Sequence, residues 1–389
     1  MSSARAETGL VLPGGGARAA YQVGALRAIA RVLPRRASQP FPVICGTSAG
    51  AINAAVLGAN ADSFRRGVAR LVRWWRAIAV TDVYRADLVT LTRHGLQLVA
   101  SLGGGGLGPE RATSLLDSSP LRRLLSDGID TARIRAQIDA GTLHAVAINA
   151  TSYGSGQAVT FYDGAPQLAP WHRVRRRGER CRLEIDHVMA SAASPLVFPA
   201  VRVGDDYFMD GSVRQIAPLA PALHLGAARV VVIAIGQFTG QSVTPAVPRY
   251  PSLGQIAGHA LSSVFLDNIA ADLERLHWIN RLAAAADSHG HVDARHIDVL
   301  VLAPSSDLGA LAVRYARRLP RGVRYLLRGL GSTRGTGSNL LSYLLFDREY
   351  CRALMRLGYT DAMARRDEIV AFLADSAVNF VPLFPPEWR

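Results

Sequence analysis

The chain has 389 residues, of which 49% are hydrophobic and 19% are charged, so it can bury a large core and is not an intrinsically disordered protein. Three cysteines, Cys45, Cys181 and Cys351, lie far apart without a Cys-x-x-Cys spacing, which gives no basis for a disulfide framework or a zinc cluster. The formal net charge is +14, and because the sequence contains no lysine, its 44 basic side chains are all arginine.

Arginine suits phosphate groups, because its guanidinium offers several hydrogen-bond donors in a fixed fork. The arginines are spread along the chain, with clusters at residues 173–177 and 317–318. We interpret them first as a solvated surface and second as a means of meeting a phosphate-rich partner such as an anionic membrane. No nucleic-acid partner is expected, because no RNA-binding motif or interleaving of aromatic and basic residues is found in the sequence.

Strands and helices are predicted to alternate through the N-terminal part of the chain. The patterns predict a strand over residues 8–12, a helix over 17–33, a strand over 41–45 and a helix over 49–57. Further strands are predicted over 143–150 and 230–235, with a hairpin around residues 154–156. This alternation is typical of an α/β fold in which helices cover both faces of a parallel sheet.

Beyond about residue 240 the composition changes. Helices are predicted over residues 253–285, 340–357 and 361–373, with one strand over 297–302 between them. We therefore predict a domain over residues 7–237, with a mainly helical C-terminal extension over 238–389 packed on it. The longest aliphatic run, residues 230–235, has the length of a strand, and no apolar signal core precedes residue 8. These features predict a soluble, cytoplasmic protein that associates at most peripherally with a membrane.

Residues 46–50 read GTSAG and carry a serine between two glycines after a predicted strand and before a predicted helix. The G-x-S-x-G pattern is typical of a sharp strand-to-helix turn that exposes a nucleophilic hydroxyl, and the alternative is a flexible loop. Ester chemistry at Ser48 also needs a base and donors for an oxyanion. Backbone amides of Gly14, Gly15 and Gly16 can supply such donors, because they follow a strand and open a helix.

The same glycines partly fit a dinucleotide-binding motif. That motif needs an acidic residue about 20 positions further on, and the sequence has no Asp or Glu between Thr8 and Ala61. Arg35 or Arg36 could instead meet the 2′-phosphate of NADP. An NADP-binding oxidoreductase therefore stays open as an alternative, although it leaves GTSAG without a role.

Taken together, residues 14–18 (GGGAR), 46–50 (GTSAG) and 210–212 (DGS) resemble, in order and spacing, the motifs of the patatin-like phospholipases. Residues 190–199 resemble the segment that leads into the family's aspartate, and the resemblance covers about residues 7–237. It implies a three-layer α/β/α hydrolase with a mostly parallel sheet. It also implies a Ser–Asp dyad without a catalytic histidine, no cofactor and no metal, and a phospholipid or another acyl-ester lipid as substrate.

Carried over to this chain, the resemblance implies that Ser48 is the nucleophile and Asp210 the base. Gly14, Gly15, Gly16 and Arg18 would form the oxyanion hole, and Gly46 and Gly50 would frame the nucleophile. An ordinary carboxylate is a weak base near neutral pH, so Asp210 must be buried or otherwise tuned, and residues 207–209 offer an apolar wall.

Several features have a second interpretation. Asp210 and Gly211 could form a plain turn, and Arg18 could orient the glycine loop, meet a substrate phosphate or be solvated. The whole protein could be a non-catalytic, cationic membrane-binding module on the same fold. Residues 88–107 predict either a lid or ordinary core packing, and Trp74 and Trp75 predict either a bilayer-facing helix or core packing.

The histidines do not point to catalysis. His289, His291 and His296 nearly reproduce a binuclear zinc motif, but the last is displaced, and we predict a solvated loop. His187 and His224 are the remaining candidates for a third catalytic member, and neither has a sequence setting that supports it.

Overall fold

The computed structural model describes residues 7–34, 39–85, 114–237, 256, 268–287, 296–329 and 338–374. Arg35, Arg36, residues 88–107, His289 and His291 lie outside this description. The strands are β1 (Glu7–Leu12), β2 (Val43–Thr47), β3 (Ala145–Ser152), β4 (Ala158–Gly164), β5 (Trp171–Arg173), β6 (Arg176–Arg180), β7 (Val201–Val203), β8 (Asp206–Asp210), β9 (Ala227–Ile233) and β10 (Asp298–Leu302).

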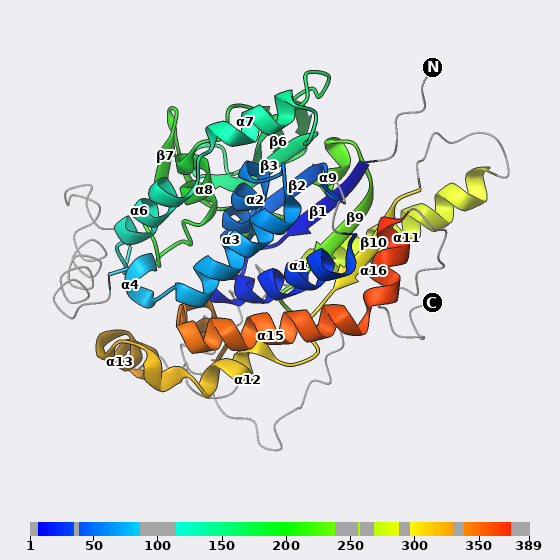
Figure 1. The fold of residues 1–389 in the computed structure, drawn as a ribbon. Helices are drawn as coiled ribbons and strands as arrows, with labels where there is room; N and C mark the ends of the chain where they lie inside the picture. Colours follow the sequence, from blue (N-terminus) through cyan, green and yellow to red (C-terminus); the bar gives the residue numbers. More distant parts are fainter. Residues whose placement is uncertain are drawn as a thin grey trace.

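The strands form one mixed sheet in the order β10-β9-β1-β2-β3-β4-β6-β5, with β8 paired to β3 and β7 paired to β8. Strands β10, β9, β1, β2 and β3 run parallel to their neighbours in that series. Antiparallel pairs join β3 to β4, β3 to β8, β5 to β6 and β7 to β8. The predicted α/β fold with a mostly parallel sheet is therefore confirmed (Figure 1).

Helices surround this sheet (Figure 1). The helices are η1 (Gly16–Ala19), α1 (Ala20–Val32), α2 (Ala49–Ala59), α3 (Phe64–Ala77), α4 (Val80–Val83), α6 (Ser119–Gly128), α7 (Ala132–Asp139), α8 (Ile185–Ser191), η2 (Gly211–Val213), α9 (Ala220–His224), α11 (Asn268–Asp287), α12 (Leu308–Val313), η4 (Ala316–Arg318), α13 (Arg321–Gly329), α14 (Ser338–Leu344), α15 (Arg348–Ala364) and α16 (Arg366–Leu373). Among the described helices, none is long and apolar enough to cross a bilayer.

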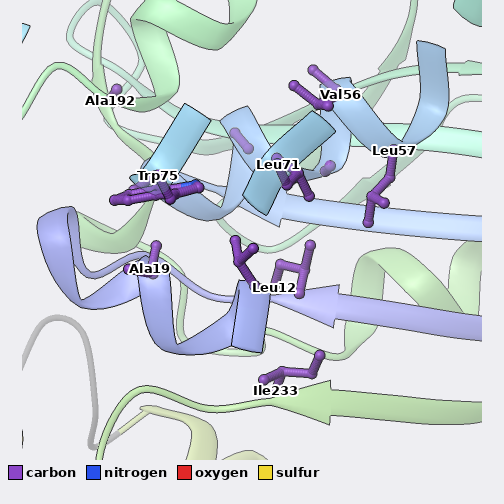
Figure 2. Packing of buried hydrophobic residues seen from close by; sticks show 14 of the residues in the cluster. Leu12, Ala19, Val56, Leu57, Leu71, Trp75, Ala192 and Ile233 are labelled. Atoms are coloured by element: carbon purple, nitrogen blue, oxygen red, sulfur yellow. The ribbon is translucent and has the colours of Figure 1, made fainter. Parts of the chain in front are cut away.

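Two hydrophobic cores lie on the two faces of the sheet. Successive side chains of a strand point to opposite faces, so Val231 of β9 joins one core and Val230 joins the other. The larger core includes residues of α1, α2, α3 and α15, and the smaller one includes residues of α9 and α11. Figure 2 shows part of the larger core, where Leu12 and Ile233 of neighbouring strands join Leu71 of α3. Helices on both faces make the predicted three-layer arrangement.

The C-terminal region is built into this architecture. Strand β10 pairs with β9, and α15 runs along α1 (Figure 1). The two helices approach closely at glycines: a Cβ on Gly24 would lie 2.2 Å from the Met355 carbonyl oxygen, and a Cβ on Gly358 would lie 2.1 Å from that of Tyr21. The boundary at residue 237 stays a prediction.

Some element limits differ from the prediction. The helix expected over residues 340–357 is two helices, α14 and α15, because the Asp347 carboxylate caps α15 by accepting hydrogen bonds from the Glu349 and Tyr350 amides. Strand β2 begins two residues later than expected and includes Gly46 and Thr47. The change matters for the site, because it places Ser48 immediately at the end of the strand.

Candidate active site

Ser48 and Asp210 meet where two strands approach each other along one edge of β3. Strand β2 runs parallel to β3 and ends with Thr47 opposite Asn149. Strand β8 runs antiparallel to β3 and ends with Asp210 opposite Ala150. Because Asn149 and Ala150 are consecutive, the residue that follows β2 lies beside the last residue of β8. The sheet therefore brings together two side chains that are far apart in the sequence.

The backbone at Ser48 is strained, with φ 55° and ψ −127°. This left-handed conformation is uncommon for a residue with a Cβ atom and is typical of a tight strand-to-helix turn at a functional site. Gly46 and Gly50 make the turn possible, because a Cβ on Gly46 would lie 2.5 Å from the Gly50 carbonyl oxygen, and one on Gly50 would lie 2.0 Å from that of Leu12. The turn is therefore closely packed, which contradicts the alternative of a flexible loop.

Ser191 of α8 holds this turn in place. The Ser48 amide donates a hydrogen bond of 2.8 Å to Ser191 Oγ, which in turn donates one of 2.6 Å to the Asn149 carbonyl oxygen. Ser191 is fully buried. Ser191 lies in the segment, residues 190–199, that resembles the family's lead into the aspartate, but no role for it is predicted from the sequence. A small serine at the end of a helix gives no signal of a partner so distant in the chain.

Asp210 is completely buried, and its carboxylate accepts hydrogen bonds from the Ser212 amide at 2.9 Å and from the Ser194 hydroxyl at 3.0 Å. Burial raises the pKa of Asp210, and hydrogen bonding from the Ser48 hydroxyl, the Ser212 amide and the Ser194 hydroxyl lowers it, with a net upward shift. A carboxylate with a raised pKa is a stronger proton acceptor than an exposed one. The burial that the sequence analysis required is therefore present.

The backbone that follows Asp210 is a short 3-10 helix, η2, and not the plain turn considered above. A Cβ on Gly211 would lie 2.1 Å from the Asn149 carbonyl oxygen, so only glycine fits against β3. Of the three residues predicted to form an apolar wall, only Phe208 is buried, where its ring packs against Phe161, whereas Tyr207 is exposed. The wall was predicted too broadly, because alternate residues of a strand face opposite ways.

The glycine loop lies between β1 and α1. Gly14 and Gly15 precede η1, which begins at Gly16 with φ 52°. A Cβ on Gly15 would lie 2.1 Å from Ile235 Cδ1, and one on Gly16 would lie 2.3 Å from the Tyr343 carbonyl oxygen. Gly16 lines the same cavity as Ser48, so the loop stands beside the nucleophile candidate.

Arg18 is not solvated, in contrast to one of its three interpretations. It is 2% exposed, and its Nε donates to Ser342 Oγ at 2.6 Å while its Nη2 donates to Asn339 Oδ1 at 2.7 Å. The guanidinium also lies 4.5 Å above the ring of Tyr343. All three partners belong to α14, which the sequence analysis did not connect with the site.

A cavity of about 210 Å³ extends from Ser48. Its wall is mainly apolar and comes from α3, α4, α6, α14 and the segment before β7, with Arg73 and Asp82 as its charged members. Such a wall would accept a hydrocarbon chain and exclude water. Large side chains that line it are Trp74, Trp75, Leu125, Phe198, Leu344 and Phe346.

The two tryptophans belong to this cavity. Trp75 is 3% exposed, its Nε1 donates to Asn53 Oδ1 at 2.8 Å, and its ring stacks on Phe346. Figure 2 shows Trp75 among the buried residues of the core. Trp74 is partly buried against that core. The bilayer-facing interpretation of this pair is therefore wrong for Trp75.

Neither candidate histidine takes part in the hydrogen bonding around Ser48. His187 Nδ1 accepts a hydrogen bond from the Glu184 amide at 3.0 Å, and the His224 ring stacks on Trp171. Burial lowers the pKa of both imidazoles. His296 Nε2 lies 3.2 Å from Asp298 Oδ1. In the ranges that the structure describes, no group of three or more His, Cys, Asp or Glu side chains is placed to hold a metal ion.

Known proteins with similar sequences or folds can be compared with this chain. A "cGAMP-activated phospholipase" of Pseudomonas aeruginosa is 27% identical over 215 residues, which are 55% of this chain and 55% of that protein. The chain therefore spans about half the length of the curated relative it matches.

Two solved structures are similar at lower identity. Human GIVD cytosolic phospholipase A2, in complex with methyl gamma-linolenyl fluorophosphonate, matches with 13% identity and a TM-score of 0.43 over 95% of this chain and 58% of that chain. The complex of SpcU with ExoU, from the type III secretion system of Pseudomonas aeruginosa, matches with 15% identity and a TM-score of 0.26 over 98% of this chain and 82% of that chain.

The patatin-like phospholipase family model matches residues 10–223, which is more than half of the 389 residues and includes the glycine loop, Ser48 and Asp210. The chain belongs to the patatin-like phospholipase family.

Proposed function

We propose that this protein hydrolyses acyl esters of lipids with a Ser48–Asp210 dyad. The observation that carries the proposal is the position of a strained Ser48 beside the buried Asp210 carboxylate at an apolar cavity. Family membership supports the same chemistry. The combination supplies a nucleophile, a base and a place for an acyl chain.

In the proposed reaction, the Ser48 hydroxyl oxygen attacks the ester carbonyl carbon while its proton moves to the Asp210 carboxylate. The carbonyl oxygen becomes an oxyanion, which the backbone amides of the glycine loop stabilise. The tetrahedral intermediate then collapses, the carbon–oxygen bond to the alcohol breaks, and the alcohol leaves with the proton. Water attacks the resulting acyl-enzyme with Asp210 as base, and the fatty acid is released as Ser48 regains its proton.

The apolar wall of the cavity supports an acyl chain as the bound part of the substrate, with a phospholipid or another acyl-ester lipid as the substrate class. We also propose that the positive charge of +14 favours adsorption to an anionic membrane surface. Arg173 and Arg175 are exposed at the turn between β5 and β6, beside Val174, which is 86% exposed. We assign the dyad to a domain over residues 7–237 and treat residues 238–389 as an extension packed on it.

Hydrolysis of a soluble short-chain ester tests the proposed function without involving a membrane. Ser48→Ala should keep the fold, because alanine fits the same turn, and should abolish hydrolysis. Ser155→Ala, in the turn between β3 and β4, is the matched control and should keep wild-type activity. Wild-type activity in Ser48→Ala, or none in the wild-type protein on any acyl ester, would overturn the proposal.

A further inference from the structure

Helix α14 lies outside the residues matched by the family model, yet it contacts the glycine loop at two places. The Tyr343 carbonyl oxygen packs so closely on Gly16 that a Cβ atom there would lie 2.3 Å away. The Arg18 guanidinium, two residues further on, donates to Ser342 and Asn339 of the same helix. One C-terminal helix therefore fixes both the backbone and the cation of the predicted oxyanion hole.

The partners that α14 offers to Arg18 are all uncharged. They are a hydroxyl, a side-chain amide oxygen and an aromatic ring. Ser342 Oγ donates its own proton to the Asn339 carbonyl oxygen at 2.6 Å, so its lone pairs are directed to the guanidinium. Within the described part of the chain, no carboxylate forms an ion pair with Arg18.

A buried cation with neutral partners is unusual, because burial of a charge is costly unless an opposite charge accompanies it. A carboxylate in place of Asn339 would neutralise the guanidinium and hold it at least as firmly. The neutral acceptors hold Arg18 in place without a direct ion pair to its guanidinium. In a water-poor site such a charge stabilises negative charge that develops nearby.

We propose that Asn339 and Ser342 are positioning residues, which hold Arg18 and the glycine loop while their neutrality preserves a positive potential for the oxyanion. This inference rests on the proposed function, because it concerns the transition state of the same reaction. It extends the active site to α14, beyond the domain over residues 7–237.

Asn339→Asp separates a structural role from an electrostatic one. The substitution keeps the size of the side chain and its acceptor oxygen, and it adds a negative charge beside Arg18. The expected result is an unchanged or higher melting temperature, an unchanged KM for a soluble short-chain ester, and a kcat that falls at least about tenfold. Arg321→Gln changes the net charge by the same unit on an exposed residue of α13 and should leave kcat unchanged.

A trifluoromethyl ketone with a short acyl chain provides the second readout, because its adduct with a serine carries an oxyanion. Asn339→Asp should weaken inhibition by this ketone by the same factor as kcat, whereas a purely structural defect would also change KM. Wild-type kcat and wild-type ketone inhibition in Asn339→Asp would overturn the inference.

Ser342→Ala keeps the inference testable if Asn339→Asp does not fold. Loss of this hydroxyl removes the acceptor of Arg18 Nε and should lower kcat and ketone affinity together without changing KM. Unchanged kcat would overturn the positioning role. Wild-type and Ser48→Ala proteins in the same assays keep the two proposals distinct: if Ser48→Ala stays active, the dyad is wrong, whereas if only the α14 variants stay active, the inference is wrong.

Discussion

Two regions of the protein meet at the glycine loop, and they differ in how they are encoded. The N-terminal region carries its candidate chemistry in short contiguous motifs, at residues 14–18, 46–50 and 210–212. The C-terminal region contributes single side chains, among them Asn339 and Ser342, which contact Arg18 across more than 300 positions of the chain. A short motif can therefore identify candidate reacting residues, whereas the residues that contact and orient them show no local sequence pattern.

The largest expected effect comes from the motif side of this comparison. Asp210→Asn should lower kcat/KM by about 10⁴-fold, nearly as much as Ser48→Ala, because members of one catalytic unit act together. His187→Ala and His224→Ala should cost little, since neither ring contributes to the hydrogen bonding around Ser48. Steady-state kinetics on a soluble ester checks this, and a histidine variant as inactive as Asp210→Asn would show that a triad operates.

Asp210 should also affect how the stability of the protein depends on pH. Burial raises the pKa of Asp210 in the folded protein, so this carboxyl lowers stability as pH rises from the ordinary pKa of an aspartate to the raised one. Asp210→Asn cannot ionise, so its melting temperature should gain on that of wild type across this pH window and keep a constant lead above it. Thermal unfolding across a pH series measures the difference, and a difference that shrinks with rising pH would contradict the assigned direction.

A smaller effect is expected where the C-terminal region packs on the N-terminal one. Glycine to alanine in a helix usually stabilises by about 1 kcal/mol. Gly358→Ala should instead destabilise by about 1–3 kcal/mol, because the new Cβ would overlap the Tyr21 carbonyl oxygen. Thr360→Ala, an exposed change on the same helix, should stay within about 0.5 kcal/mol of wild type. Denaturant unfolding measures the free energy of unfolding of both variants. A more stable Gly358→Ala would show that α15 does not pack tightly against α1 at this position.

The next effect is a shift in pH dependence. Ser194→Ala removes a hydrogen bond that favours the ionised form of Asp210, so the pKa of this carboxylate should rise further. The base must be ionised to act, and the acidic limb of the kcat/KM profile should move to higher pH. Ser155→Ala should leave the limb in place. An acidic limb that does not move, or that moves to lower pH, would show that the Ser194 hydroxyl does not lower the pKa of the catalytic base.

The smallest effect concerns the exposed arginines. Arg173→Gln combined with Arg175→Gln should weaken adsorption to anionic vesicles, and salt should weaken it in the wild type, because exposed charges are screened beyond about 8 Å at physiological ionic strength. Hydrolysis of a soluble ester should stay unchanged. Vesicle co-sedimentation over a salt series provides the measurement, with neutral vesicles as control. Equal binding to both vesicle types would remove the proposed preference for an anionic surface.

The sequence predicted the sheet and most of its strands, and it singled out Ser48, Asp210 and the glycine loop as candidates, because strand periodicity and glycine-rich turns are local properties. It did not predict the roles of Ser191, which accepts a hydrogen bond from the Ser48 amide, or Ser194, which donates one to Asp210. In a sequence, a buried serine cannot be distinguished from an exposed one. The sequence also did not predict that the helix is interrupted between α14 and α15. The apolar pattern continues through this point, and only the Asp347 cap marks the start of α15. Arg18 was identified, but its partners were not, because they lie in another part of the chain.

The roles of Ser48 and Asp210 are tested most directly by the site at which a fluorophosphonate with a short alkyl chain labels the protein. We expect one adduct on Ser48, located by mass spectrometry of the digested protein. The rate of labelling should fall strongly in Asp210→Asn and stay near wild type in His187→Ala. A label on another serine, or a rate in Asp210→Asn equal to that of wild type, would contradict the assignment of Ser48 as nucleophile and Asp210 as its base.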